Sequence, residues 1–276
     1  MPAKNGYGSK TEEMSCGASW KKHKGSAPAF PEGNSGLVFS QFPLRRSGPK
    51  YFMTRLILIR HGETEWNETK RFQGMSDIPL SSKGMDQAEA LARSLEREPL
   101  GAIYTSPLIR ARQTASCLAR HHSCPFVVIE ALRELNQGRL EGLTGEDLRR
   151  DFPGFLSKWL EEPGETVLPG GESLGELQRR VWAAIEDVIG RHPEKTVAVV
   201  AHSFVILTIL CRALDLPLQA FRRFRQDPAA KNILEFSERG ITLQCLNDTC
   251  HLNLEPLPRD ERGGMEKSGE VKGKRE

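Results

Sequence analysis

The chain has 276 residues, of which 38% are hydrophobic and 27% are charged. This is an ordinary composition for a soluble protein, and no apolar run approaches the length of a membrane span, so we expect no membrane partner. The formal net charge of +3 is uneven, because residues 1–52 hold eight Lys and Arg against three Glu. The remainder is therefore slightly acidic, which argues against a nucleic-acid partner, since domains that bind nucleic acid are usually basic.

The two ends of the chain differ in composition from its middle. Residues 1–52 are rich in Gly, Ser, Lys and Pro without hydrophobic periodicity, which predicts a disordered basic extension. Residues 255–276 are charged and predict a flexible tail, leaving one folded domain over residues 53–254. The six cysteines form no C-x-x-C pair, and no apolar segment of a signal peptide is present. We therefore expect free thiols and a cytoplasmic protein.

The predicted elements alternate between strands and helices along the chain. Short apolar runs predict four buried strands, at residues 55–60, 102–105, 126–129 and 196–200. Apolar residues at helical spacing predict four main helices, at residues 82–98, 107–121, 174–188 and 205–214. Ser81 or Ser82 caps the first of these helices, Pro107 lies in the first turn of the second, and Ser173 caps the third.

Two further segments complete the predicted domain. Residues 140–169 are polar and interrupted by Gly and Pro, with short helical pieces at 146–151 and 155–161. A long irregular segment of this kind, here called the excursion, usually covers a binding or active site. Residues 232–236 and 242–245 predict a late hairpin that turns at Arg239-Gly240. The alternation of strands and helices predicts an α/β domain with a mainly parallel sheet and helices on both sides.

Chemically active side chains follow the end of each predicted strand. They are His61 after the first strand, Ser106 and Arg110 after the second, Glu134 after the third and His202 after the fourth. In open α/β sheets, ligands bind outside the carboxyl ends of the strands. With Arg60, these residues would form a small positive pocket that contains one acid, which suits a phosphoryl group.

Six segments in order are similar to those of the histidine phosphatase superfamily, the phosphoglycerate-mutase-like group, over about residues 53–254. They are LIRHGETEWN at 58–67, FQGMSDIPLSSKG at 72–84, SPLIRARQTA at 106–115, LRELNQGRLEG at 132–142, LPGGES at 168–173 and VVAHS at 199–203. The resemblance implies a three-layer α/β/α sandwich. It also implies phosphoryl transfer that needs no metal and no other cofactor.

The resemblance assigns catalytic roles to five residues. His61 would attack phosphorus as neutral imidazole and form a phosphohistidine. Arg60 and Arg110 would clamp the phosphoryl oxygens and lower the pKa of His61 by charge repulsion, and His202 would stabilise the same oxygens. Glu134 would protonate the leaving alcohol and then activate water.

The resemblance also implies residues that bind the substrate: Asn67, Gln73, Gly74 and Ser203. Many relatives have Gly after the second histidine, so Ser203 is a departure that bears on substrate choice. His251 resembles the end of the family's domain and is interpreted as structural. Four cations are either solvated or meet a second anionic group of the substrate: Arg139, Arg149, Arg150 and Lys158.

Three functions are compatible with such a site. The first is a phosphomonoesterase that acts on a small phosphorylated metabolite, and LNQGRLEGLTGEDL resembles alpha-ribazole phosphatases and broad-specificity phosphomonoesterases. The second is a phosphoglycerate mutase, although mutases carry a longer insertion than the 68 positions that separate Glu134 from His202. The third is a non-catalytic module that binds a phosphorylated ligand.

The carboxylates of Glu130 and Glu141 lie near enough in sequence to compete with Glu134 for the role of the acid.

Overall fold

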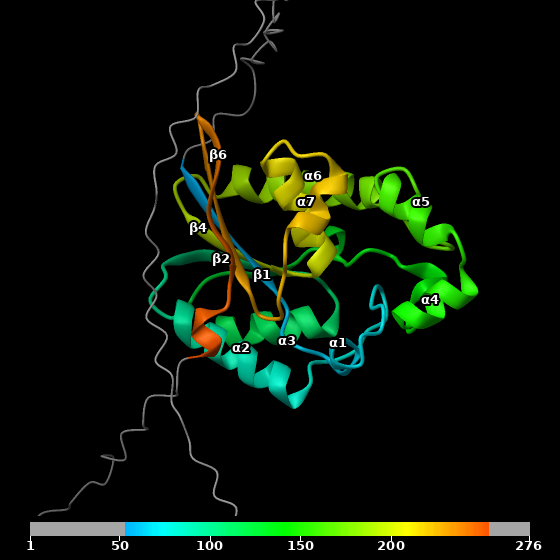
Figure 1. Ribbon diagram of the computed structural model, residues 1–276. Helices are drawn as coiled ribbons and strands as arrows, with labels where there is room; N and C mark the ends of the chain where they lie inside the picture. The colour runs from blue at the N-terminus through cyan, green and yellow to red at the C-terminus, as the bar shows by residue number, and fades with distance from the viewer. Residues whose placement is uncertain (1–52, 254–276) are drawn as a thin grey trace, which may run out of the picture. The chain divides into compact units, whose positions relative to one another are not determined.

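The computed structural model describes residues 53–253, so the predicted extension over 1–52 and the tail over 255–276 lie outside the described residues. Within this range, six strands form one sheet in the order β3-β2-β4-β1-β5-β6 (Figure 1). Their bounds are β1 (Thr54–Arg60), β2 (Leu100–Thr105), β3 (Phe126–Val128), β4 (Thr196–Ala201), β5 (Lys231–Ser237) and β6 (Gly240–Asp248). The first four strands are parallel, and the hairpin of β5 and β6 adds two strands beside β1, of which β5 runs antiparallel to it. The expectation of a mainly parallel sheet is confirmed.

Four long helices cover the two faces of the sheet (Figure 1). They are α2 (Ser82–Leu95), α3 (Ile109–Ala119), α6 (Leu174–Arg191) and α7 (Ser203–Ala213). Alternate residues of β1 point to opposite faces: Ile57 and Ile59 pack with α2 and α3, whereas Leu56 and Leu58 pack with α6 and α7. Burial on both faces explains why the strand is an unbroken apolar run.

The helix starts follow local capping chemistry. The hydroxyl of Ser81 accepts a hydrogen bond from the Gly84 amide at the start of α2, and Ser173 caps α6 as predicted. Helix α3 begins at Ile109, so the prediction that Pro107 lies in its first turn is wrong. The Asp77 carboxylate accepts the Ile109 amide proton at 2.6 Å and thereby fixes the later start.

The remaining helices are short. They are α1 (Glu65–Glu68), α4 (Gly145–Asp151), α5 (Phe155–Glu161) and the 3₁₀ turns η1 (Glu130–Leu132), η2 (Gly138–Leu140), η3 (Leu218–Arg223) and η4 (Cys250–Leu252). The hairpin turns at residues 238–239, one position earlier than predicted, because Gly240 with φ of +119° already begins β6.

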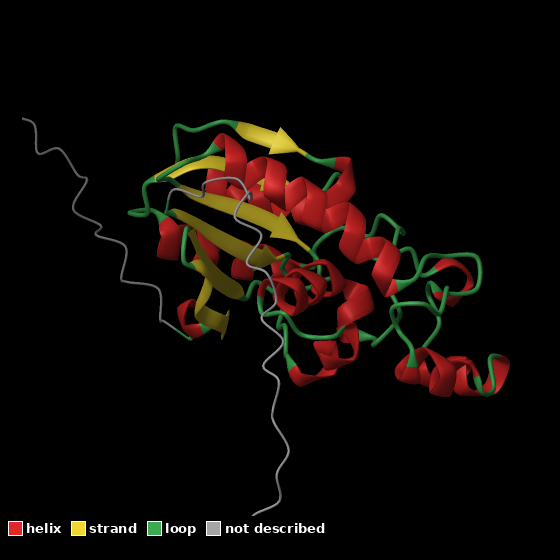
Figure 2. Ribbon diagram, turned by 90° about the horizontal axis from the view of Figure 1, so that it is seen from above, coloured by secondary structure: helices red, strands yellow, loops and turns green. Residues whose placement is uncertain are grey.

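Helices α4 and α5 lie beyond one end of the sheet in both views, beside the carboxyl ends of its parallel strands (Figures 1 and 2). Both were predicted as helical pieces of the excursion, and Gly154, with φ of +77°, separates them. In the part of the chain that the structure describes, no helix is both long and apolar enough to cross a membrane.

Candidate active site

The parallel strands bring distant polar residues to one edge of the sheet. The His61 amide donates to the Ala201 carbonyl at 3.0 Å, and the Ser106 amide donates to Val200 at 3.1 Å, so β1, β2 and β4 end side by side. Above these strand ends lies a cavity of about 200 Å³. Its lining residues are Arg60, His61, Asn67, Arg71, Phe72, Gln73, Glu134, Gln137, Ser203 and Phe204.

His61 is held in one tautomer by its own neighbour. The ring is only 3% exposed, and Nδ1 lies 2.7 Å from the Gly62 carbonyl oxygen. A carbonyl only accepts hydrogen bonds, so Nδ1 carries the proton and Nε2 keeps a free electron pair. The pKa of His61 lies well below its usual value because of burial first, and then because of the charges of Arg110 and Arg60. The predicted charge repulsion is therefore present, but desolvation is the larger cause.

His202 lies against His61 at the end of β4. The two ring centroids are 5.1 Å apart, and His202 Nε2 lies 2.7 Å from the Ser106 hydroxyl oxygen. The side chain is fully buried, and its Nδ1 has no hydrogen-bond partner within residues 53–253. Burial and the charge of Arg110 hold the pKa of His202 well below its usual value. Both rings are therefore neutral at neutral pH.

Two guanidinium groups lie near the histidines, that of Arg110 fully buried and that of Arg60 partly buried, and main-chain carbonyls anchor both. Arg60 Nη1 donates to the Gln226 carbonyl at 2.5 Å, and Arg110 donates to the carbonyls of Ser76 and Gly74, each at 2.8 Å. Burial lowers the pKa of Arg110 to about 10, so it remains charged at neutral pH. Neither guanidinium has a carboxylate within ion-pair distance among the described residues, and the Nε atoms of both are unpaired there.

Glu134 is the carboxyl group that lines this cavity. It is 4% exposed, and its two oxygens accept hydrogen bonds from the amides of Leu135 at 2.8 Å and Phe204 at 3.2 Å. Burial raises the pKa of Glu134, against the opposing effect of those amides and of Arg110 and Arg60. A carboxyl group with a raised pKa can hold a proton to donate and then accept one back.

The two competing carboxylates have other positions. Glu130 forms an exposed ion pair with Arg133. Glu141 accepts the amide protons of Met75 at 2.7 Å and Ser76 at 2.8 Å, so it fixes the loop whose carbonyls anchor Arg110. Neither group lines the cavity.

The four residues expected to bind the substrate divide into two groups. Asn67, Gln73 and Ser203 line the cavity, whereas Gly74 does not. A Cβ atom at Gly74 would lie 2.5 Å from the Leu135 carbonyl oxygen, so a side chain would separate this loop from the segment that carries Glu134. Gly74 therefore allows its loop to lie close to the backbone of Leu135, and its carbonyl binds Arg110.

The sequence interpretation gave Arg180, on α6, no role in the site. Arg180 Nη1 donates to the carbonyls of Ala131 at 2.7 Å and Arg133 at 2.8 Å, and Nη2 donates to the Glu134 carbonyl at 3.0 Å. Its other partner is the Glu172 carboxylate, at 2.6 Å. One side chain of α6 thus holds the segment that presents the acid, and no helical period signals this role.

The cations proposed for a second anionic group do not line the cavity. Arg150 pairs with Asp147 and Asp151, and Arg139 lies over the Phe152 ring. Arg71, which the sequence interpretation missed, is instead the exposed cation of the lining, and its Nη1 donates to the Gly142 carbonyl at 2.7 Å.

A parallel sheet that gathers two neutral histidines, two unpaired guanidiniums and one carboxyl group at its edge defines an enzyme of phosphate-ester chemistry. The profile of the histidine phosphatase superfamily (branch 1) matches residues 56–249. Phosphoserine phosphatase 1 of Hydrogenobacter thermophilus is 37% identical over 200 residues, which is 72% of this chain and 95% of that protein. A probable phosphoglycerate mutase of Yersinia pestis is 31% identical over 76% of this chain and all of that protein.

Solved structures give the same result. A putative alpha-ribazole-5'-P phosphatase of Escherichia coli superposes with a TM-score of 0.66 and 27% identity, over 71% of this chain and 97% of that one. The chain belongs to the histidine phosphatase superfamily, and within it to the phosphomonoester hydrolases.

Proposed function

We propose that this protein hydrolyses small phosphomonoesters through a phosphohistidine on His61, without a metal ion. The observation that carries the proposal is the state of His61. Its ring is neutral, its proton is fixed on Nδ1 by the Gly62 carbonyl, and it lies beside two guanidiniums that lack a carboxylate partner. Such a ring is a nucleophile, and such cations attract a phosphoryl group.

The first step transfers the phosphoryl group to the enzyme. His61 Nε2 forms a bond to phosphorus while the bond from phosphorus to the ester oxygen breaks. Protonated Glu134 gives its proton to that oxygen, so the product leaves as a neutral alcohol. In the second step, the Glu134 carboxylate takes a proton from water, whose oxygen attacks phosphorus and breaks the bond to Nε2. Inorganic phosphate leaves, and both side chains return to their starting states.

The unpaired polar atoms of the site suit the charge of the transferring group. Arg60 Nε, Arg110 Nε and His202 Nδ1 are buried N–H groups or ring nitrogens without partners among the described residues. Donors that are already in place around phosphoryl oxygens stabilise the transition state without reorganisation. These donors take the place that a metal ion has in other phosphatases.

A phosphoglycerate mutase is the second candidate, because the probable mutase of Yersinia pestis matches over its whole length. It would return the phosphoryl group from His61 to a second hydroxyl instead of to water. We place the reaction in the cytoplasm, in keeping with the free thiols of all five cysteines in the described range.

The test uses the full chain, an aryl phosphate and excess chelator. We expect the wild type to release phosphate and to carry an acid-labile, alkali-stable phosphoryl label, and His61→Ala to lose at least about 10³-fold in turnover and all of the label. His121→Ala, at a half-buried residue two positions beyond α3, is the matched control and should retain both. Turnover that appears only with added divalent metal, or survives in His61→Ala, would overturn the mechanism. Interconversion of phosphoglycerates that depends on a bisphosphoglycerate primer would favour the mutase.

A further inference from the structure

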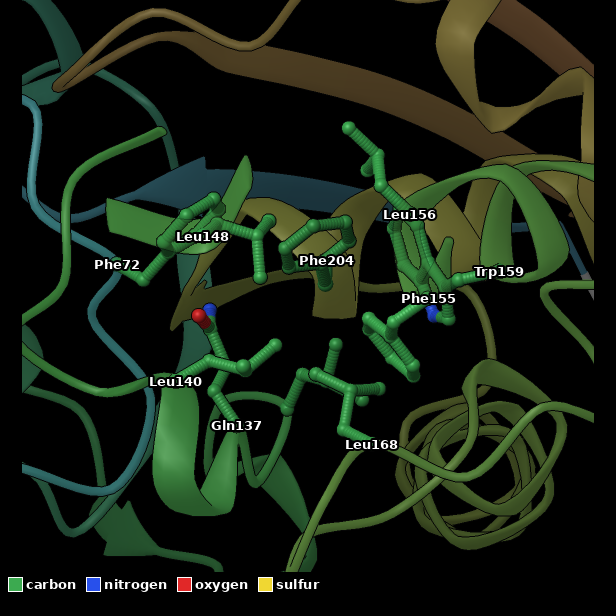
Figure 3. A pocket seen from close by; sticks show the side chains of 10 residues that line it. Phe72, Gln137, Leu140, Leu148, Phe155, Leu156, Trp159, Leu168 and Phe204 are labelled. Atoms are coloured by element: carbon green, nitrogen blue, oxygen red, sulfur yellow. The ribbon is translucent and has the colours of Figure 1, made fainter. Parts of the chain in front are cut away.

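A second cavity, of about 40 Å³, lies beside the active-site cavity that contains His61 and Glu134. Its lining is almost wholly carbon (Figure 3). The two cavities share three lining residues, Phe72, Gln137 and Phe204. The rest of the second lining is seven apolar side chains, five of them leucines. We call it the leucine cavity. The shared residues make the two cavities direct neighbours.

The walls of the leucine cavity come mainly from the excursion that was predicted to cover the site. Leu148 lies on α4 and Leu156 and Trp159 lie on α5, whereas Leu168 precedes α6. The Trp159 ring meets Phe204 of α7 edge-on, with centroids 6.0 Å apart. The cover therefore packs directly against the helix whose first turn binds Glu134.

Gln137 marks the junction of the two cavities. It is 3% exposed, its Nε2 donates to the Gln73 carbonyl at 3.3 Å, and its Oε1 has no partner in residues 53–253. Figure 3 shows its amide directed toward Phe72. Buried polar atoms are almost always hydrogen-bonded. A donor on the bound molecule at this point would satisfy Oε1.

We propose that the leucine cavity binds the compact apolar end of the substrate's alcohol. This inference rests on the proposed function and names its substrate class: phosphate esters of alcohols that end in a small alkyl group or the edge of a ring. The alcohols of this class also carry a hydrogen-bond donor, such as a hydroxyl or an amide N–H, between the ester oxygen and the apolar end. This donor faces Gln137 Oε1. A cavity of 40 Å³ would hold about three waters, which corresponds to about three carbon atoms. Serine is a poor match, since its charged groups would lose water against leucines.

The test compares straight-chain alkyl phosphates from ethyl to hexyl. Their alcohols have similar acidities, so the chemical step stays nearly constant while the apolar length grows. We expect kcat/KM to rise about fourfold for each methylene until the cavity is full, after about three of them, and phosphoserine to fall below butyl phosphate. A flat or falling series, or phosphoserine above butyl phosphate, would overturn the assignment.

A pair of variants on α5 tests the position of the cavity. Leu156→Trp fills it and should reduce the ratio of the hexyl to the ethyl kcat/KM at least tenfold. Ser157→Trp adds the same ring to the exposed side of the same helix and should keep the ratio. Equal ratios in the two variants would show that the apolar group binds elsewhere.

Binding without turnover separates this inference from the proposed hydrolysis. Alkylphosphonates cannot be hydrolysed, and their affinity for the wild type is measured by titration calorimetry. If no ester is hydrolysed but affinity rises with chain length, the hydrolysis is wrong and the cavity assignment stands. If esters are hydrolysed but affinity is independent of length, the cavity assignment is wrong and the hydrolysis stands.

Discussion

The floor of the site and its cover are built in different ways. The floor comprises the five side chains at the strand ends, Arg60, His61, Arg110, Glu134 and His202, and the last four are at most 4% exposed. Main-chain groups hold most of them, through the hydrogen bonds of His61, Glu134 and both arginines. The cover, residues 140–169, has main-chain hydrogen bonds to the rest of the chain near its two ends, as at Gly142 and Pro163, but side chains form its cavity walls and α5 contains no fully buried residue.

This difference indicates which part of the site can vary. Main-chain hydrogen bonds do not depend on the identity of the donor's or acceptor's side chain, so the floor keeps its geometry as long as the sheet folds. The walls of the leucine cavity change with every substitution of Leu148 or Leu156. We therefore expect reaction type to follow the floor and substrate choice to follow the cover.

The largest effect should come from removing the acid of the floor. Glu134→Gln keeps the shape of the side chain but cannot donate a carboxyl proton, so kcat/KM on butyl phosphate, which reports the first step, should fall about 10²- to 10⁴-fold. The loss of kcat/KM on p-nitrophenyl phosphate should be much smaller, because that phenolate leaves without a proton. Glu130→Gln, at an exposed carboxylate, is the control and should change neither. Equal losses on both esters would remove Glu134 from the role of the acid.

The buried histidines predict a loss of stability in mild acid. The pKa values of His61 and His202 are lowered in the folded protein, so the unfolded chain binds more protons as the pH falls below about 6.5. Stability should fall from that pH downward, by up to about 1.4 kcal/mol per pH unit for each ring. Denaturant unfolding at pH 7.0, 6.0 and 5.5 should show a shallower fall in a His61→Asn, His202→Gln double variant. Glu134 has the opposite effect, because its raised pKa favours folding as the pH falls. Both proteins contain Glu134, so its effect cancels when their free energies of unfolding are subtracted at each pH.

The smallest effect tests Arg180, a side-chain support of the floor. Arg180→Met removes the donors to the carbonyls before and at Glu134, so kcat on butyl phosphate should fall roughly tenfold. The apparent pKa of Glu134 in the pH dependence of kcat should also shift. Arg180→Lys should restore part of the rate, and Arg179→Met, at the exposed neighbour, should have no effect. If Arg180→Met behaves like Arg179→Met, main-chain contacts alone hold the floor.

The floor was largely predictable from the sequence, because four of its residues end or follow buried strands and Glu134, beyond the exposed strand β3, matches a motif. The apolar run that ends at Arg60 and the Val-rich run that ends at His202 place both histidines at one sheet edge without knowledge of any contact. The geometry now brings the five side chains together, and their catalytic roles stay predictions. The start of α3 was missed because its cap, Asp77, comes from a loop 32 positions earlier.

The cover and the supports of the floor were less predictable. Helical periodicity separates polar from apolar faces, so it assigns Arg180 to the polar face of α6 but does not show that carbonyls of another segment lie there. Phe72, Gln137 and Phe204 come from three distant segments, and only the folded chain brings them to both cavities. Residues 140–169 were expected to cover the site, but their pattern does not show what they enclose.

The hydrogen bond between His61 Nδ1 and the carbonyl of Gly62 has a consequence for sequence drift. In enzymes whose histidine is oriented by a carboxylate, a single substitution elsewhere in the chain can release the ring. Here the orienting oxygen belongs to the peptide bond between residues 62 and 63, and every amino acid supplies such an oxygen. Position 62 is limited for another reason: a Cβ atom there would lie 2.4 Å from the Gly84 carbonyl oxygen. The tautomer of His61 therefore depends on the path of the main chain, and a substitution elsewhere can change it only by displacing the backbone.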